Sequence, residues 1–470
     1  MKGTRTDICV IGAGAAGLSV AAGAVQMGAR VILIEAGEMG GDCLNAGCVP
    51  SKALLAAGHK AHQTAQAAFG VAGHDPAPDF AAAKDHLHAV IARIAPVDSQ
   101  ERFEALGVRV IRAKARFVSP TTLEAGGDVI TARRFVIATG SRPMLPPIPG
   151  LAGVPVLTNE TLFDLRERPE HLIIIGGGPI GVEMAQAHRR LGSAVTVLEA
   201  ARLLGRDDPE AVALVLARLS ADGVVIHEDA AVTRVSGQPG AVQVDTATGL
   251  RVTGSHLLIA AGRQPVVDGL GLDQAGVAHG PRGITVDAGL RTSNRRIYAI
   301  GDVTGGAQFT HVAGYQAGLI LRPLLFGLRA RLRHDHVPHV TYTDPEIAQV
   351  GLTEDAARRT YGAALTIARA DFDHNDRAIA TGQAQGFAKV MVVRGRPVGA
   401  TIVGPQAGEL IQLWGLAIAA RLKMSAVAGM ISPYPTLGEI NKRAAGAYFA
   451  PRLFDSPWVK RVVRAVQWLP

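Results

Sequence analysis

Cys43 and Cys48 are the residues of this sequence best suited to redox chemistry. Four residues separate them, and such a pair can close a small disulfide ring. Pro50 and an Ala/Leu-rich stretch follow, which predicts a helix that begins close to Cys48, where the helix dipole stabilises a thiolate. Two reduced core cysteines are the alternative. Cys9 lies in a predicted buried strand with no partner nearby in sequence, and is expected to be a core residue.

A glycine-rich turn precedes the cysteine pair. Residues 7–37 predict a strand, a turn, a helix and a second strand, with Gly12, Gly14 and Gly17 in the turn and Glu35 closing the second strand. The glycines allow a pyrophosphate to approach the helix N-terminus, and the acid accepts hydrogen bonds from a ribose. A coincidental glycine turn is the alternative, but the complete strand and helix context favours a dinucleotide site.

The same pattern recurs in residues 172–199. Gly176, Gly178 and Gly181 occupy the turn, and Glu199 ends the second strand. Two such units predict two dinucleotides, or one dinucleotide divided between two sites.

Composition and length define the class of protein. The chain has 470 residues, of which 48% are hydrophobic and 19% charged, so it is long enough for about three folded domains and is not disordered. Aromatic residues are only 4%, and the net charge of +8 is not concentrated in one block outside the C-terminus, which argues against nucleic-acid binding. Three cysteines are too few for a disulfide-stapled secreted protein, which favours the reducing cytoplasm.

The sequence pattern changes after about residue 335. Segments 340–342, 388–393 and 398–403 predict strands, and 408–422 predicts an apolar helix. This texture favours a third domain of the α+β class. The predicted fold is therefore α/β, with two Rossmann-like dinucleotide-binding domains and a C-terminal α+β domain.

With these motifs the chain resembles the FAD-dependent pyridine nucleotide–disulfide oxidoreductases of class I, which include dihydrolipoyl dehydrogenase, glutathione reductase and mercuric reductase. The resemblance extends to about Phe449. Segment 43–52 resembles the redox-active disulfide motif of the family. Segment 135–143 resembles the crossing between domains, and segment 260–265 resembles the end of the nicotinamide domain. Segment 298–302 resembles the second flavin motif, and segment 340–346 resembles the start of the dimerisation domain.

The resemblance implies the cofactors and the residues that bind them. The residues implied for FAD are Gly12, Gly14, Gly17, Glu35, Lys52, Ala115, Thr139, Gly140, Asp302, Thr310, His311 and Ala313. The residues implied for NAD are Gly176, Gly178, Gly181, Glu183, Glu199 and Gly262. Glu199 would repel a 2′-phosphate, so NADH is expected rather than NADPH, although Arg202 and Arg206 offer an alternative phosphate cradle.

The resemblance also implies catalytic roles. Lys52 would lie beside the flavin and pair with Glu183, since a cation stabilises the reduced ring. Cys48 would contact the flavin, and Cys43 would attack the substrate. The N-terminus of a helix that begins at 310–313 would add positive potential.

Three features depart from the family pattern. Tyr434 stands where the family has a histidine base, although Glu439, which would orient that base, is present. Mercuric reductases also carry a tyrosine at this place. They have in addition a C-terminal cysteine pair that transfers the metal ion to the active site, and this chain lacks that pair, because no cysteine follows Cys48. Asp42 replaces the usual threonine before Cys43, and the sequence alone offers no account of it.

The expected domains are an FAD-binding domain in two parts, an NAD(P)-binding domain, a dimerisation domain and a basic tail. The FAD-binding domain is expected over 1–150 and 266–336, and the NAD(P)-binding domain over 151–265. The dimerisation domain is expected over 337–450 and the tail over 451–470. As a homodimer, the protein would join the disulfide of one subunit to the segment of Tyr434 and Glu439 in the other.

The expected function is transfer of electrons from NADH, through FAD and the cysteine pair, to a small disulfide or a soft electrophile such as a metal ion, in the manner of a mercuric reductase. A dihydrolipoyl dehydrogenase is the alternative enzyme. A membrane-associated redox partner protein is the alternative of another class. No metal site is predicted, because the histidines that cluster in sequence lie in an Arg-rich linker without other ligands: His334, His336 and His339.

The C-terminal tail motivates the membrane hypothesis. Residues 458–469 predict an amphipathic helix with Lys460, Arg461 and Arg464 on the polar face. Such a helix binds an anionic membrane or a partner, or it packs on its own subunit or on the dimer mate.

Overall fold

The computed structural model describes residues 2–469, which form two compact units. The first unit comprises the chain up to Gly177 together with residues 187–200 and 229–332. The second comprises residues 178–186, 201–228 and the chain from Arg333 onward. These units group segments by packing, so the expected domain bounds stay predictions.

A mixed sheet forms the centre of the first unit. Its strand order is β3-β2-β1-β6-β5-β4, with β18 paired to β6, and β1, β2, β3, β6 and β18 run parallel. Parallel strands end at one edge, so the turns that follow β1, β2, β6 and β18 meet there. The strands are β1 (Lys2–Ile11), β2 (Val31–Glu35), β3 (Arg109–Arg112), β4 (Ala115–Ser119), β5 (Thr122–Ala125), β6 (Asp128–Ile137) and β18 (Ile297–Ala299).

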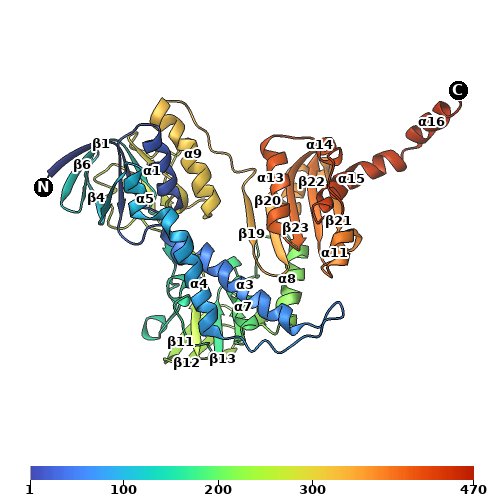
Figure 1. Cartoon of the computed structure of the whole chain (residues 1–470), viewed down its shortest axis with the longest axis horizontal. Coiled ribbons are helices and arrows are strands. Elements are labelled where there is room, and N and C mark those ends of the chain that lie inside the picture. Colours follow the sequence, from blue (N-terminus) through green and yellow to red (C-terminus); the bar gives the residue numbers. More distant parts are fainter. Residues whose placement is uncertain (1, 470) are drawn as a thin grey trace. The chain divides into compact units, whose positions relative to one another are not determined.

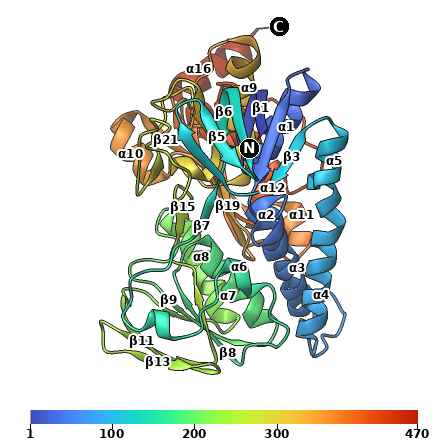
Figure 2. The same cartoon turned by 90° about the vertical axis from the view of Figure 1, so that its left-hand side faces the viewer.

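Side-chain alternation along β1 builds a core on each face of this sheet. Ile8 and Val10 pack with α1 (Ala15–Gln26) and α9 (Thr310–Phe326), which lie side by side in Figure 1. Cys9 packs into the opposite cluster and is fully buried, which confirms that it is a core residue. Figure 2 shows α3 (Cys48–Ala65) beside α4 (Phe80–Ile94).

The second glycine-rich motif, in residues 172–199, is also confirmed as strand, helix and strand. The parallel strands β9 (Ala194–Leu198), β8 (His171–Ile175) and β14 (His256–Ile259) lie next to one another, and α7 (Pro179–Arg190) follows the turn after β8. An antiparallel sheet of three strands accompanies them: β11 (Val232–Gln238), β12 (Ala241–Thr246) and β13 (Arg251–Gly254).

The second unit contains an antiparallel sheet of five strands in the order β19-β20-β23-β22-β21. Its strands are β19 (Pro338–Thr341), β20 (Glu346–Gly351), β21 (Leu365–Asp371), β22 (Phe387–Val393) and β23 (Arg396–Gly404). The predicted strands are therefore confirmed. The helix predicted over 408–422 is confirmed only in part: it is interrupted at Ile411 into α12 (Ala407–Leu410) and α13 (Gln412–Ala419), and it ends before Arg421, whose φ of 55° cannot continue a helix.

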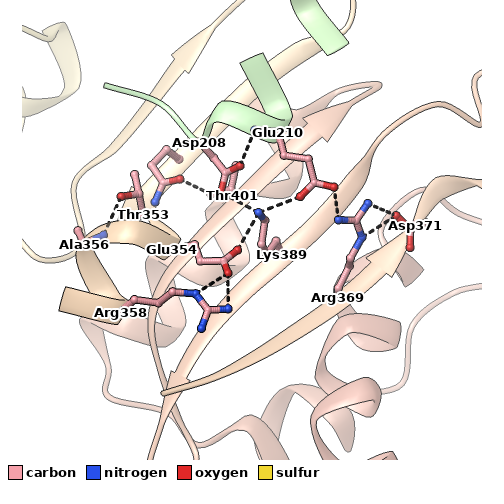
Figure 3. Close-up of polar contacts among 11 residues, drawn as sticks. Asp208, Glu210, Thr353, Glu354, Ala356, Arg358, Arg369, Asp371, Lys389 and Thr401 are labelled. Atoms are coloured by element: carbon pink, nitrogen blue, oxygen red, sulfur yellow. Dashed lines mark hydrogen bonds and ion pairs between the residues drawn. The ribbon is translucent and has the colours of Figure 1, made fainter. Parts of the chain in front are cut away.

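A buried lysine holds α8 (Pro209–Ala221) against this sheet. Lys389 on β22 is only 6% exposed, and its Nζ lies 2.9 Å from Asp208, 3.0 Å from Glu210 and 2.9 Å from Glu354 on α10 (Glu354–Tyr361). Figure 3 shows these carboxylates around the ammonium group. Burial alone would lower the pKa of Lys389, but the hydrogen bonds to the carboxylates raise it to about 12, so the group is charged.

Candidate active site

The structure brings the two redox candidates together at the edge where the parallel strands end. Cys43 lies on α2 (Gly41–Asn45), and Cys48 is the first residue of α3. Their thiols share a hydrogen bond, and the Sγ of Cys48 also lies 3.4 Å from the Oγ1 of Thr310, the first residue of α9. Cys48 is exposed and Cys43 is half-buried. The Cys48 sulfur therefore lies beside the first residues of two helices, where the helix dipoles place positive potential.

This arrangement separates the acidities of the two thiols. The hydrogen bond from Cys43 lowers the pKa of Cys48 to about 6, and the Thr310 hydroxyl and the Lys52 charge act in the same direction, which outweighs the opposing effect of lost solvation. The same bond and burial raise the pKa of Cys43 well above its usual range. At neutral pH the reduced pair therefore holds a thiolate at Cys48 and a proton at Cys43.

Asp42 has a structural role that the sequence did not reveal. Its Oδ1 accepts a hydrogen bond from Asn159 Nδ2 at 2.8 Å, and its Oδ2 lies 3.2 Å from Arg263 Nη2. Asn159 also donates to the carbonyl of Ala46, between the two cysteines. The carboxylate therefore anchors the redox loop to the chain segments that precede β8 and follow β14, and Arg263 balances its charge.

Arg263 continues this network to Asp302. Arg263 Nε donates to Ser141 Oγ at 2.7 Å, and Ser141 Oγ donates to Asp302 Oδ2 at 2.6 Å. Burial raises the pKa of Asp302, and the Ser141 hydrogen bond partly offsets that effect. Asp302 lies in the short helix η3 (Gly301–Thr304) after β18, at the strand edge where the resemblance implies the flavin ribityl chain.

The first glycine-rich turn has room only for glycine. Gly12 has a φ of 104°, and a Cβ there would stand 2.3 Å from the carbonyl oxygen of Ala138. Glu35 spans the turn: its carboxylate accepts hydrogen bonds from the backbone N–H of Ala13 at 2.5 Å and of Gly37 at 2.6 Å. A cradle of this shape, with an acid at its rim, fits an adenine dinucleotide.

The other predicted FAD residues lie in the same unit. Thr139 Oγ1 donates to the carbonyl of Val266 at 2.7 Å, and Gly140 follows with a φ of 70°. The His311 ring stacks on Phe309 next to the start of α9. The remaining predicted residues fall on α1, α3, β4 and α9: Gly14 as the residue before α1, Gly17, Lys52, Ala115 and Ala313.

The second glycine-rich turn repeats this geometry. Gly176 has a φ of 115°, and a Cβ there would stand 2.4 Å from the carbonyl oxygen of Ala260. Glu199 Oε2 accepts from the N–H of Gly177 at 2.7 Å, as Glu35 does in the first turn. Gly262 has a φ of 122° just beyond β14.

The remaining predicted NAD residues begin or lie on α7. Gly178 precedes that helix, and Gly181 and Glu183 lie on it. Glu183 Oε1 accepts from the backbone N–H of Tyr342 at 2.9 Å. Lys52 and Glu183 belong to different units, so their pairing stays a prediction.

Tyr434 and Glu439 lie near each other in the second unit but do not share a hydrogen bond among the described residues. Tyr434 is 69% exposed, and its hydroxyl donates to Asp376 at 2.8 Å, which raises the pKa of the phenol. Glu439 begins α15 (Glu439–Phe454), and its Oε2 is buried without a hydrogen-bond partner in residues 2–469. This unsatisfied acceptor is suited to orient a donor such as an imidazole.

Sequence reasoning missed the partners of several predicted residues. Arg263 lies in a motif that the sequence analysis identified, so its positive charge could have been used to predict an ion pair with Asp42. Asn159 and Asp376 carried no such signal, because they come from segments without a motif.

Comparisons with known proteins show which proteins this chain is similar to. Residues 6–317 match the family described as pyridine nucleotide-disulphide oxidoreductase, and residues 337–445 match its dimerisation domain. The chain is 36% identical to a mercuric reductase of Streptomyces lividans, with 95% of this chain and 96% of the relative covered. It is 34% identical to a dihydrolipoyl dehydrogenase of Bacillus subtilis, with 92% and 96% covered.

A solved structure is also similar to this chain. It is the Cu(II) complex of the HOCl-induced flavoprotein disulfide reductase RclA from Escherichia coli. The TM-score is 0.85 at 31% identity, and the match covers 94% of this chain and 99% of the other.

Proposed function

Because the chain belongs to the pyridine nucleotide-disulphide oxidoreductase family, we propose that it passes electrons from NADH through FAD and the Cys43–Cys48 pair to a small disulfide or a soft metal ion. It is a flavin-dependent oxidoreductase, its family uses FAD and NAD(P)H, and its dimerisation domain makes it a homodimer. The observation that carries the proposal is the thiol pair beside Thr310, with acidities set for a thiolate at Cys48.

The protein residues perform the thiol chemistry. FAD, when bound, supplies the electron pair of NADH to the disulfide. Cys48 then leaves as a thiolate that Thr310 and Lys52 stabilise, and Cys43 takes up a proton. With a disulfide acceptor, Cys43 gives up that proton and attacks one sulfur, which breaks the S–S bond of the acceptor and releases its first half as a thiol that carries the proton. Cys48 then attacks the Cys43 sulfur of the mixed disulfide, releases the second half, which takes a proton from solvent, and restores the Cys43–Cys48 bond.

The acceptor class rests on Tyr434 and on the relatives. A phenol with a raised pKa is a poor base, but it can donate a hydrogen bond or a proton to a departing thiolate. Relatives are named mercuric reductase, and the RclA structure is a Cu(II) complex, which supports a soft metal as acceptor. Because one relative is named dihydrolipoyl dehydrogenase, dihydrolipoamide oxidation is the second candidate activity.

A panel of acceptors tests the proposal. NADH oxidation by the purified dimer would be measured with glutathione disulfide, coenzyme A disulfide, lipoamide, Hg(II), Cu(II) and quinones. Turnover with a disulfide or a soft metal is the expected result. Turnover with quinones alone would contradict the proposal, because quinone reduction does not require the thiol pair.

The second glycine-rich turn predicts the nicotinamide preference. The Glu199 carboxylate, which accepts from the N–H of Gly177, is expected to accept from the ribose 2′-hydroxyl, and Arg202 is paired with Glu228 at 2.9 Å. We expect a kcat/KM for NADH at least about tenfold above that for NADPH, and we expect Glu199→Ser to narrow this ratio by relieving repulsion of the 2′-phosphate. Initial rates with both nucleotides provide the measurement, and a preference for NADPH in the unmodified enzyme would refute the assignment.

Tyr434→His is expected to raise dihydrolipoamide oxidation at pH 7 by roughly a hundredfold, the usual contribution of a general base. Only about 0.1% of an ordinary phenol is ionised at this pH, whereas an imidazole titrates close to it and could be oriented by Glu439. Tyr434→Phe is the matched control and should bring no gain. Rapid dihydrolipoamide oxidation by the unmodified enzyme at neutral pH would show that Tyr434 does not limit this reaction.

We also propose that the enzyme works in the cytoplasm. The support is the small number of cysteines, which suits a reducing compartment.

A further inference from the structure

The C-terminal helix α16 (Pro457–Val466) has no buried residue. Ser456 caps its N-terminus by accepting from the N–H of Val459, so the helix begins at a defined point after α15. Figure 1 shows it extending from the end of α15, away from the five-stranded sheet of its unit. No side chain of α16 forms a hydrogen bond or ion pair with another element in residues 2–469. Packing within its own compact unit is therefore not what stabilises this helix.

Its apolar residues form one continuous face. Trp458, Val462 and Val466 follow one another at helical spacing and are 70%, 39% and 51% exposed. Val463 widens the same face and is 52% exposed. A short helix with such a face is not stable alone in water, so it needs a surface to cover it.

The opposite face carries only positive charge. Lys460, Arg461 and Arg464 lie there, and residues 456–469 contain no acidic residue. Trp468, 90% exposed, follows the helix, so a tryptophan stands near each end of it. Tryptophan at the ends and cations along the side are the pattern of helices that lie at a lipid–water boundary.

The alternative occupant is the second subunit, but the features of α16 do not favour it. The match to the dimerisation domain ends at residue 445, before α16 begins. A helix that packs in a dimer interface usually mixes charges of both signs at its rim, whereas this one carries a single sign.

We propose that α16 binds the surface of anionic membranes, with its apolar face in the boundary between headgroups and acyl chains. At ten residues, about 15 Å, it is half the length that would cross the hydrocarbon layer, and no described helix is long and apolar enough to do so. Each cation strengthens binding to an anionic surface about fivefold, so the three together contribute roughly a hundredfold. The dimer carries two such helices, which adds avidity.

Vesicle co-sedimentation of the FAD-loaded dimer tests the proposal. Vesicles of phosphatidylcholine alone would be compared with vesicles that also contain phosphatidylglycerol. The variants would be a chain that ends at Asp455, which keeps α15 whole, the charge reversal Lys460→Glu/Arg464→Glu, and the face variant Trp458→Ser/Val462→Ser. Arg359→Glu, on the exposed side of α10, is the control for the reversal of a single charge elsewhere on the surface.

The expected result is binding to the anionic vesicles that weakens with salt, falls at least about twentyfold in the charge reversal, and disappears without α16. The face variant should also lose binding, and the control should retain it. NADH oxidation and light scattering would be measured on every variant. Equal sedimentation with and without α16, or a dimer that dissociates on its removal without any vesicle binding, would overturn the proposal. The assay reads lipid binding alone, so its outcome is independent of the proposed acceptor.

Discussion

Cys43→Ser is expected to lower NADH-dependent reduction of every disulfide and soft-metal acceptor by at least about a thousandfold, because it removes the nucleophile that the acceptor meets. The serine hydroxyl can still donate to Cys48, so the Cys48 thiolate should survive. It should be visible as long-wavelength charge-transfer absorbance with oxidised flavin. Cys48→Ser should abolish both the absorbance and turnover.

Cys9→Ala is the matched control for these variants. Cys9 is fully buried in β1, and burial raises the pKa of its thiol far above the useful range. Its removal should leave kcat within about twofold of the original, because the effect of an isolated core substitution falls on stability. Turnover that persists in Cys43→Ser would remove the cysteine pair from the mechanism.

The largest expected effect on stability comes from Lys389→Met. This change removes an ammonium group whose side chain is only 6% exposed and leaves Asp208, 2% exposed, and Glu354, 22% exposed, without their cation, whereas Glu210 is 47% exposed and is solvated. Removing one partner from a buried ionic pair costs about 3–5 kcal/mol, so we expect a loss near the lower end of that range. Urea unfolding at fixed protein concentration and neutral pH provides the measurement. Arg358→Met is the control: Arg358 pairs with the same Glu354 but is 61% exposed, so its loss should cost less than about 1 kcal/mol.

The pH dependence gives this prediction a second test. Although burial acts in the opposite direction, hydrogen bonds from Lys389 and its arginine neighbours lower the pKa of Glu210 and Glu354 below the ordinary 4.5. Their contribution to stability is thus present above about pH 4.5 and is lost as the pH falls through the lowered pKa values. In Lys389→Met, protonation of these carboxylates instead relieves the repulsion among them. The difference in unfolding free energy between the unmodified protein and Lys389→Met should therefore shrink on acidification. A difference that stays constant with pH would argue against the network.

The sequence predicted most of the fold because its motifs tie local geometry to chemistry. The turns at Gly12 and Gly176 each require glycine for a close approach to a neighbouring strand, so both strand–helix–strand units were predictable. The helix over 408–422 was predicted only in part, because apolar periodicity reveals neither the interruption at Ile411 nor the positive φ at Arg421.

The site was predictable where residue type alone defines the role, as for Cys48 at a helix N-terminus. The contacts of Asp42 with Asn159 and Arg263 were not, because they join segments more than a hundred residues apart. The hydrogen bond from Tyr434 to Asp376, which raises the pKa of the phenol, was not predictable either, because it joins segments 58 residues apart in sequence. Such pairings depend on tertiary packing, which a motif does not encode.

A count of thiols tests the central claim most directly, because the chain has only three cysteines and Cys9 is buried alone. The FAD-loaded enzyme would be isolated oxidised, treated anaerobically with NADH, denatured and labelled with a thiol reagent, and the labels counted by mass spectrometry. The account predicts one labelled cysteine, Cys9, before NADH and three after it. Three before NADH, or one after it, would contradict an electron path through Cys43 and Cys48.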